Sequence, residues 1–160
     1  MTESEYNQAV ETCANALFRF LYKQLNVRED AENIVQDSFE TLWLNREKVE
    51  FAKVKSWLFT TGYRKMIDQL RREKKMDEMP EIIKEKGEAV AQPDMKRIID
   101  TALAKLPEIQ RTVIMLRDYE GYDYEEIGKI TGLNESQVKV YIFRGRQTIK
   151  NYIVRLENVI

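Results

Sequence analysis

The chain lacks histidine entirely and has a single cysteine, Cys13, among its 160 residues. A zinc site built from cysteine and histidine is therefore excluded, and one cysteine cannot close an internal disulfide. A Ser-His-Asp triad is excluded as well, because its general base is missing. With 27 acidic residues, a carboxylate-only enzyme or a Mg²⁺ site stays open as an alternative. We nevertheless expect a protein that is not an enzyme and that carries neither a cofactor nor a metal.

Long apolar runs are also missing. No run approaches the roughly 20 residues that a helix needs to cross a bilayer. The opening residues, MTESE, are acidic and contain no apolar signal core, so we do not expect export or membrane insertion. Together with the low cysteine content, this indicates a cytoplasmic protein.

Glycine and proline are scarce, with six and three residues respectively, and apolar residues recur at helical spacing. We therefore expect an all-α protein. The stretch 76–93 contains Pro80, Gly87 and Pro93 among many charges, which is typical of a flexible linker. It would join two small helical domains, 1–75 and 94–160. The expected helices cover roughly 4–25, 30–46, 55–75, 95–106, 107–120, 123–131 and 135–156.

The chain has almost no excess of either charge sign, since 26 basic and 27 acidic residues give a net charge of −1. These charges are, however, unevenly distributed along the sequence. Residues 63–76 hold six cations against two anions, and residues 135–155 hold five against one. Residues 1–50 hold ten anions against five cations. The basic segments could contact phosphates, and the acidic remainder could dock on a basic protein surface. The alternative is that the basic segments are merely solvated helix faces.

The segment TGLNESQVKVYIFRGRQTIK, residues 131–150, has the pattern of a helix-turn-helix. Asp123 and Asn134 are each followed three residues later by Glu or Gln, which predicts two capping boxes, and Gly132 suits the turn between the helices. The second helix of such a unit lies in the major groove. A core hairpin without a ligand is the alternative. The residues expected to face duplex DNA are Ser136, Gln137, Lys139, Val140, Phe143, Arg144 and Arg146.

Aromatic residues alternate with cations in KSWLFTTGYRKMIDQLRREKK, residues 55–75. Unpaired bases stack on aromatic rings while cations follow the backbone, so this composition suits single-stranded DNA. The alternative is that Trp57 and Phe59 are ordinary core residues. Duplex recognition at one end and strand capture in the middle form an unusual combination.

Three segments in this order resemble the extracytoplasmic-function (group 4) sigma factors of bacterial RNA polymerase, in the sigma-70 family. They are DAENIVQDSFETLWLN (30–45), KSWLFTTGYRKMIDQLRR (55–72) and LPEIQRTVIMLRDYEGYDYEEIGKITGLNESQVKVYIFRGRQTI (106–149). The resemblance implies a transcription initiation factor without enzymatic activity. Its partners would be the clamp helices and the flap of core RNA polymerase, promoter DNA in double- and single-stranded form, and an anti-sigma factor.

The resemblance also assigns residues to roles. The first segment would present a polar face to the polymerase, and the second would melt and read the −10 element. Residues 46–54 would form the loop that captures a flipped base, and the recognition helix would read the −35 element. The polymerase-binding residues would be Asp30, Glu32, Asn33, Gln36, Asp37 and Glu40. The −10 residues would be Trp57, Tyr63, Arg64, Asp68, Arg71 and Arg72.

Two other functions are alternatives to a sigma factor. An autonomous helix-turn-helix regulator would explain 107–150 equally well, but it leaves the acidic segment 30–45 and the aromatic-basic segment 55–75 without a role. A helical hydrolase with a carboxylate metal site would need clustered inward-facing acids, as in a Glu-x-x-His pattern, and the chain has no histidine.

Overall fold

A computed structural model describes residues 1–76 and 94–159, and within them every regular element is helical. This confirms the all-α prediction. The expected linker lies outside the described residues except for Met76, where the third helix ends. The elements are α1 (Glu3–Leu25), α2 (Arg28–Leu44), a 3₁₀ turn η1 (Phe51–Lys53), α3 (Val54–Met76), α4 (Met95–Lys105), α5 (Glu108–Ile114), a π-helical turn η2 (Met115–Tyr119), α6 (Tyr124–Thr131) and α7 (Glu135–Val159).

Local chemistry explains where helices begin and end. Thr2 and Glu5 form a capping box at the start of α1, with Glu5 N donating to Thr2 Oγ1 at 3.1 Å. Asn26, in the left-handed conformation with φ 58°, ends α1, as asparagine tolerates this conformation better than most residues. Pro107 directly precedes α5, where its missing N–H costs no helical hydrogen bond.

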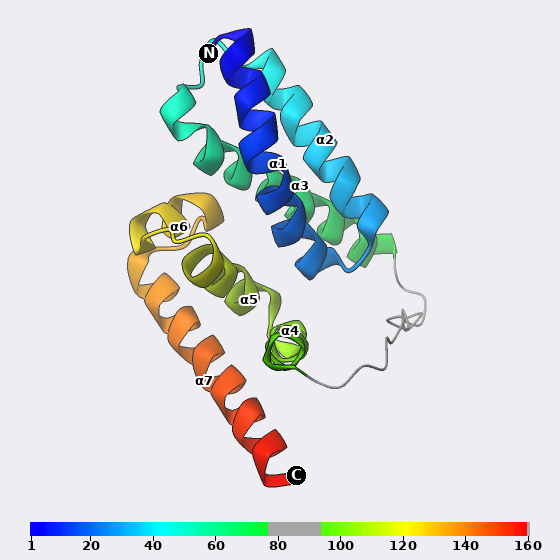
Figure 1. Ribbon diagram of the computed structural model, residues 1–160, viewed down its shortest axis with the longest axis vertical. Coiled ribbons are helices and arrows are strands. Elements are labelled where there is room, and N and C mark those ends of the chain that lie inside the picture. Colours follow the sequence, from blue (N-terminus) through cyan, green and yellow to red (C-terminus); the bar gives the residue numbers. More distant parts are fainter. Residues whose placement is uncertain (77–93, 160) are drawn as a thin grey trace.

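The N-terminal half is a bundle of α1, α2 and α3 (Figure 1). Each of the three helices contributes large apolar side chains that are almost fully buried. Burying one such side chain contributes about 1.5–3 kcal/mol to the free energy of folding, so these buried side chains provide most of the stability of the bundle. Its largest members are Leu17, Phe20, Leu21, Leu42, Leu58, Phe59 and Met66.

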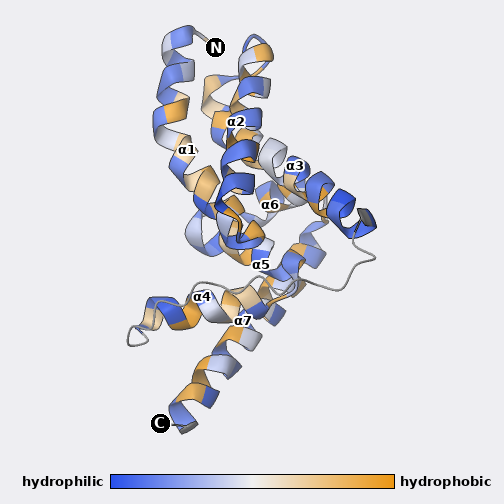
Figure 2. Cartoon of the chain, turned by 90° about the vertical axis from the view of Figure 1, so that its right-hand side faces the viewer, coloured by the Kyte–Doolittle hydropathy of each residue, from blue (hydrophilic) through white to orange (hydrophobic). Residues whose placement is uncertain are grey.

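In the C-terminal half, α4, α5 and α6 all pack against the long helix α7. Figure 1 shows α7 running away from the bundle toward the C-terminus, with α4 beside its middle. Figure 2 shows hydrophobic residues where these helices meet and a mostly hydrophilic end of α3 on the other side of the molecule. None of the described helices is long and apolar enough to span a membrane.

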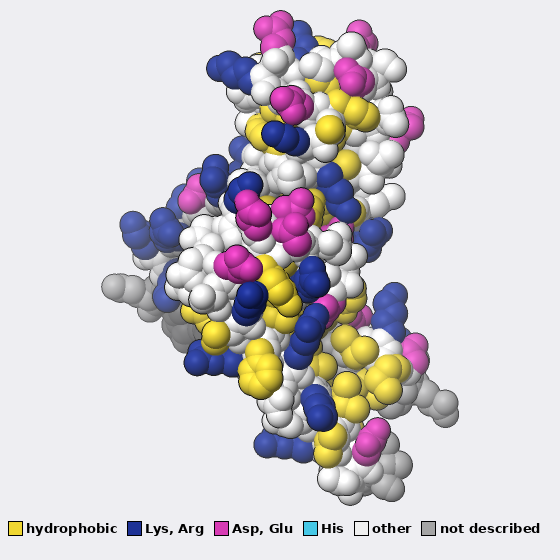
Figure 3. All heavy atoms as spheres, turned by 90° about the vertical axis from the view of Figure 1, so that its left-hand side faces the viewer, with side chains coloured by type: hydrophobic (Ala, Val, Ile, Leu, Met, Phe, Trp, Pro, Cys, Tyr) yellow, Lys and Arg dark blue, Asp and Glu magenta, His cyan; other side chains and the backbone are white. Residues whose placement is uncertain are grey.

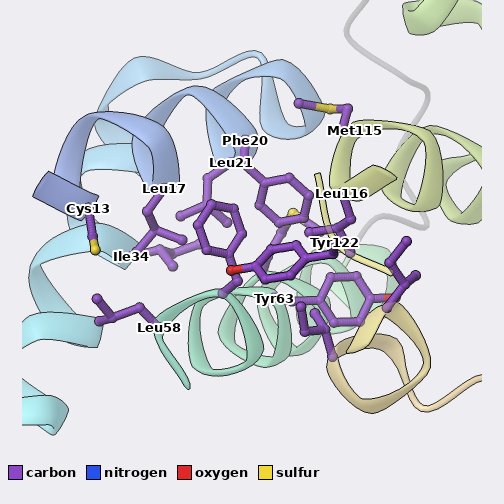
Figure 4. Close-up of a cluster of buried hydrophobic side chains, with 14 of the residues drawn as sticks. Cys13, Leu17, Phe20, Leu21, Ile34, Leu58, Tyr63, Met115, Leu116 and Tyr122 are labelled. Atoms are coloured by element: carbon purple, nitrogen blue, oxygen red, sulfur yellow. The ribbon is translucent and has the colours of Figure 1, made fainter. Parts of the chain in front are cut away.

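The two halves share one hydrophobic core, which the sequence does not predict. Tyr122, from the turn before α6, is 8% exposed, and its ring lies 5.9 Å from that of Phe59 on α3. Figure 4 shows Tyr122 reaching among side chains of the N-terminal bundle, with Leu116 beside it. Helix α3 packs against α6 of the C-terminal half as well as against α2. Tertiary packing thus joins residues more than 60 positions apart in sequence.

Candidate nucleic-acid interface

The helix-turn-helix is built by the capping interactions that the sequence predicts. Glu126 N donates to Asp123 Oδ1 at 2.8 Å, and Gln137 N donates to Asn134 Oδ1 at 2.8 Å. Between the two helices Gly132 has φ 80°, a conformation that glycine adopts without strain. Both capping boxes and the glycine turn are therefore confirmed.

Helix α7 divides its apolar residues between two faces. Val138 and Ile142 are buried against the rest of the C-terminal half. Val140 is 43% exposed and Phe143 is 68% exposed. Burial of the first pair holds α7 in place, while the exposed pair can meet a thymine methyl group. Ser136, Gln137, Lys139, Arg144 and Arg146 are exposed as expected.

The cations of this face differ in their contacts. Lys139 Nζ lies 3.4 Å from Glu135 Oε1 and 5.5 Å from the centre of the Tyr124 ring. Arg146 forms a two-pronged ion pair with Asp118, which raises the pKa of the guanidinium. Figure 3 shows cations interleaved with hydrophobic side chains over the part of the surface that α6 and α7 present. A hollow of about 310 Å³ there is lined by Tyr124, Lys139, Ile142, Phe143, Arg146, Gln147 and Lys150.

Helix α3 carries a second candidate DNA-binding face. At 3.6 residues per turn, positions 57, 64, 68 and 71 fall on one side of a helix. Arg64, Asp68, Arg71 and Arg72 are exposed, and Trp57 is half-buried and packs against the core. The aromatic ring at position 57 therefore has a structural role in addition to any contact with a base.

Tyr63 differs in exposure from the other predicted −10 residues. It is only 7% exposed, and this burial raises its pKa. It follows Phe59 by four residues on the side of α3 that meets the C-terminal half, about 100° round the helix from Arg64. In this arrangement Tyr63 cannot contact DNA, and any such role requires the two halves to separate.

Polar contacts border the shared core between the halves. Lys23 Nζ lies 2.9 Å from Asp100 Oδ1, and Lys55 Nζ lies 3.2 Å from Glu120 Oε2. The rim of the contact is therefore made of ion pairs between the two halves.

Inside this rim, the Thr112 hydroxyl lies 2.9 Å from Gln24 Oε1 and 3.0 Å from Glu108 Oε1. A hydroxyl has one proton, so it can donate to only one of these oxygens at a time. Among the described residues, Gln24 Nε2 and the Tyr122 hydroxyl are buried without a hydrogen-bond partner. Water could reach both groups if the halves separated, which lowers the cost of opening.

The acidic face predicted for polymerase binding lies on α2. Glu32, Asn33, Gln36, Asp37 and Glu40 are exposed, whereas Asp30 is half-buried. Glu32 accepts a hydrogen bond from Arg28 Nε at 2.9 Å. A groove of about 490 Å³ separates this face from α3 and is lined by Ile34, Asp37, Lys65, Asp68, Gln69, Arg71, Arg72 and Lys75.

At the end of α2, Trp43 continues the helical spacing of the buried Phe39 and Leu42, yet it is not part of the core. The Trp43 ring lies at the surface, 5.0 Å from the ring of Tyr6 and 4.0 Å from the guanidinium of Arg46. Beside it, Leu44 is 81% exposed. At the start of the predicted base-capturing loop 46–54, the Leu44 side chain therefore points into solvent, whereas the Trp43 ring lies on the outside of the bundle against Tyr6 of α1. Val49 and Val54 are the buried residues that attach this loop to the core.

Sequence reasoning missed Tyr122 and Asp118, two residues that organise the candidate interface. Both belong to the segment that ends α5 and leads to α6. Their partners, Phe59 and Arg146, are 63 and 28 positions away, and one sequence carries no signal for such pairings. The helix predicted to continue to about residue 120 instead changes to a π-helical turn at Met115–Tyr119.

Comparison with known proteins identifies both halves. Residues 9–76 match the family described as Sigma-70 region 2, and residues 96–149 match Sigma-70, region 4. The chain is 31% identical over 139 residues to the RNA polymerase sigma factor SigV of Bacillus subtilis, covering 83% of this chain and 81% of that protein. It is 26% identical over 142 residues to the ECF RNA polymerase sigma factor SigM of the same organism, covering 85% and 87% of the two chains.

Solved structures share the fold. The sigma factor RpoE of Bartonella quintana, in complex with the anti-sigma factor NepR, superposes with a TM-score of 0.76 at 23% identity, covering 92% of this chain and 96% of that one. CnrH, in complex with the cytosolic domain of CnrY, superposes with a TM-score of 0.67 at 22% identity, covering 94% and 88%. With matches to both sigma regions in order and curated relatives along most of its length, the chain belongs to the extracytoplasmic-function sigma factors of the sigma-70 family.

Proposed function

We propose that this chain is a cytoplasmic transcription initiation factor that binds core RNA polymerase and directs it to specific promoters. The observation that carries the proposal is the divided recognition helix. Val138 and Ile142 secure α7, while Val140 and Phe143 face solvent beside Lys139 and Arg144. Cations that reach phosphates or guanine edges, next to apolar groups that meet thymine methyls, are what duplex recognition requires. We assign this face to the −35 element.

The −10 element would be read by the exposed face of α3. Arg64, Arg71 and Arg72 can follow the strand backbone, and Trp57 can support a stacked base. Tyr63 would join them only after the C-terminal half moves away from α3. The loop 46–54 would capture a base flipped out of the stack, which costs a few kcal/mol that contacts in the loop must offset.

Core polymerase would bind the acidic face of α2 through its clamp helices, and its flap would contact the C-terminal half. Five of the six predicted polymerase-binding residues are exposed on α2, and a carboxylate-rich face favours a basic partner. Docking on the enzyme also explains how a chain with a net charge of −1 could bind promoter DNA, because the polymerase would make most of the contacts with the DNA.

An anti-sigma factor is the further partner that we propose. RpoE of Bartonella quintana was solved with the anti-sigma factor NepR, and CnrH with the cytosolic domain of CnrY. The fold shared with those two proteins supports a comparable complex here. The anti-sigma factor would bind the chain with its two halves packed together.

Transcription in vitro tests the proposal. Bacterial core polymerase would be supplied with a promoter library, with and without the full chain, and the transcripts mapped. We expect defined start sites only when the chain is present, and fewer transcripts with Arg144→Ala. A chain that neither binds core polymerase nor creates start sites would contradict the proposal.

A gel shift separates the sigma factor from an autonomous helix-turn-helix regulator. We expect the chain alone to retard promoter duplex weakly and the complex with core polymerase to retard it strongly. Tight, sequence-specific retardation by the chain alone would favour the regulator instead.

A further inference from the structure

The pairing of Asp118 with Arg146 joins the π-helical turn after α5 to the middle of the recognition helix. Arg146 Nε donates to Asp118 Oδ2 at 3.3 Å, and Arg146 Nη2 donates to Asp118 Oδ1. Two parallel hydrogen bonds between a guanidinium and a carboxylate restrict orientation as well as distance. This pair therefore constrains how α7 is rotated with respect to α5.

Arg146 stands at the border between the buried and the exposed face of α7. At 3.6 residues per turn, it lies about 40° round the helix from the buried Ile142 and about 120° from the exposed Val140. Its side chain is 50% exposed, and that of Asp118 is 38% exposed. The guanidinium is thus directed along the protein surface toward η2.

A close approach beside this pair sets the spacing of the same two helices. A Cβ atom added to Gly145 would lie 2.3 Å from Ile114 Cδ1 and 3.3 Å from Ile114 Cγ1, so any larger residue would force the Ile114 side chain to shift. A contact on the line between two helix axes controls their separation but leaves rotation about the axis less restricted. The ion pair, displaced to one side of that contact, adds a restraint on rotation to the one that the buried Val138 and Ile142 provide.

Rotation of α7 matters because the reading side chains lie far from its axis. Their tips are about 5–6 Å from the axis, so a rotation of about 20° moves them by about 2 Å. A good hydrogen bond tolerates only a few tenths of an ångström in donor–acceptor distance. Contacts made by Lys139 and Arg144 would be lost by such a movement.

We propose that Asp118 is a positioning residue for the recognition helix, and that it acts through Arg146. The Arg146 guanidinium is then committed to the protein rather than to DNA, which changes the role expected for it from the sequence. This inference rests on the proposed function, since it concerns how the same face meets the −35 element.

The test measures how the full chain, bound to core polymerase, prefers a promoter fragment with an intact −35 element over one with that element scrambled. Titrations at several salt concentrations would be run for Asp118→Asn, Arg146→Gln and the reversed pair Asp118→Arg with Arg146→Asp. We expect each single variant to reduce the preference by about three- to fivefold, as the loss of a half-exposed ion pair allows. The salt dependence should stay unchanged, and the reversed pair should recover most of the preference.

A matched control is Glu125→Gln, which removes one carboxylate from an exposed ion pair with Lys129 on α6, where Oε1 and Nζ lie 3.4 Å apart. It alters net charge as Asp118→Asn does and should change the preference by less than about twofold. Thermal unfolding of every variant would be recorded beside the titrations. The proposal would be overturned if the single variants lost the preference for the −35 element only because they unfold, and if the reversed pair did not regain it.

Direct contact of Arg146 with DNA predicts the opposite pattern. Arg146→Gln would then reduce the salt slope by about one, Asp118→Asn would raise affinity by releasing the guanidinium, and the reversed pair would not recover. That pattern, or single variants that change nothing, overturns the proposal. A wild-type complex that shows no preference for the intact element contradicts the proposed function instead.

Discussion

The two candidate DNA-binding surfaces differ in how accessible they are. The reading face of α7 is open, with Val140 and Phe143 exposed beside exposed cations. The corresponding face of α3 is open only in part, because Tyr63 is buried and Phe59 packs against Tyr122. The C-terminal half thus presents its own surface while it covers part of the other.

This difference indicates that binding of duplex and binding of separated strands place different demands on the chain. The −35 contact that we propose could form with the halves packed together as they are here. Full use of α3 would require the shared core to open, at the cost of the apolar area buried around Tyr122. The ion pairs at the rim and the unpaired buried polar atoms make this contact less costly to open than an entirely apolar one.

Removing the Tyr122 ring should have the largest effect on this comparison. Tyr122→Ala deletes a buried aromatic side chain and leaves a cavity between the halves, so we expect the free energy of unfolding to fall by about 2–4 kcal/mol. Urea denaturation measures this loss, and small-angle scattering should show a larger radius of gyration. Tyr22→Ala, at an exposed ring on α1, is the matched control and should do far less. Equal losses in both variants would contradict the role of Tyr122 as the centre of the contact.

Truncating the open surface should have the next largest effect, on promoter use rather than on folding. Lys139→Ala or Arg144→Ala should weaken promoter binding of the polymerase complex by about 1–3 kcal/mol if the contact is to a base. Competition binding with single base-pair changes in the −35 element provides the measurement. A uniform loss over all sequences would show instead that the residue contacts only phosphate.

The stability of the chain should depend on which partner is removed from the buried hydrogen bond between Thr112 and Gln24. Thr112→Val deletes the hydroxyl that Gln24 and Glu108 share and leaves these groups less satisfied, so we expect a loss of about 1–3 kcal/mol. Adding Gln24→Leu replaces a second polar group with an apolar one and should restore part of the stability. Chemical denaturation of the single and double variants measures both steps. A double variant less stable than the sum of the singles would contradict this account.

The smallest effect is expected at the ionic rim. Lys23→Ala breaks the ion pair with Asp100 and the contact with the Tyr119 ring, whose centre lies 4.7 Å from Nζ. Both groups are partly exposed, so the loss should be about 0.2–1 kcal/mol and should shrink as salt is added. A double-mutant cycle with Asp100→Ala, at low and high salt, isolates the coupling. A coupling unaffected by salt would show that the ring contact dominates.

Helix positions and caps were predictable because they depend on neighbours in sequence. The pairs Asp123 with Glu126 and Asn134 with Gln137 are three residues apart, and Gly132 responds to the local turn. The order of the three family segments likewise follows from the sequence. Exposure of Lys139, Arg144, Arg71 and Arg72 followed from their place opposite the apolar stripes.

Exposure of Tyr63 and Trp43 was not predictable, because each depends on what lies beside its helix. Tyr63 has an aromatic-basic neighbourhood that suits DNA, yet another half of the chain covers it. Trp43 has helical core spacing, yet α2 ends beside it and leaves the ring at the surface.

By itself the sequence determined the helical segments, their caps and the two basic faces, since these depend on residues within a few positions of one another. Only the tertiary structure decided which faces remain open and which cation turns to a carboxylate, as with Arg146 and Asp118. The physical reason is that burial and ion pairing depend on distances in space, and packing of α3 against α6 joins segments that are remote along the chain.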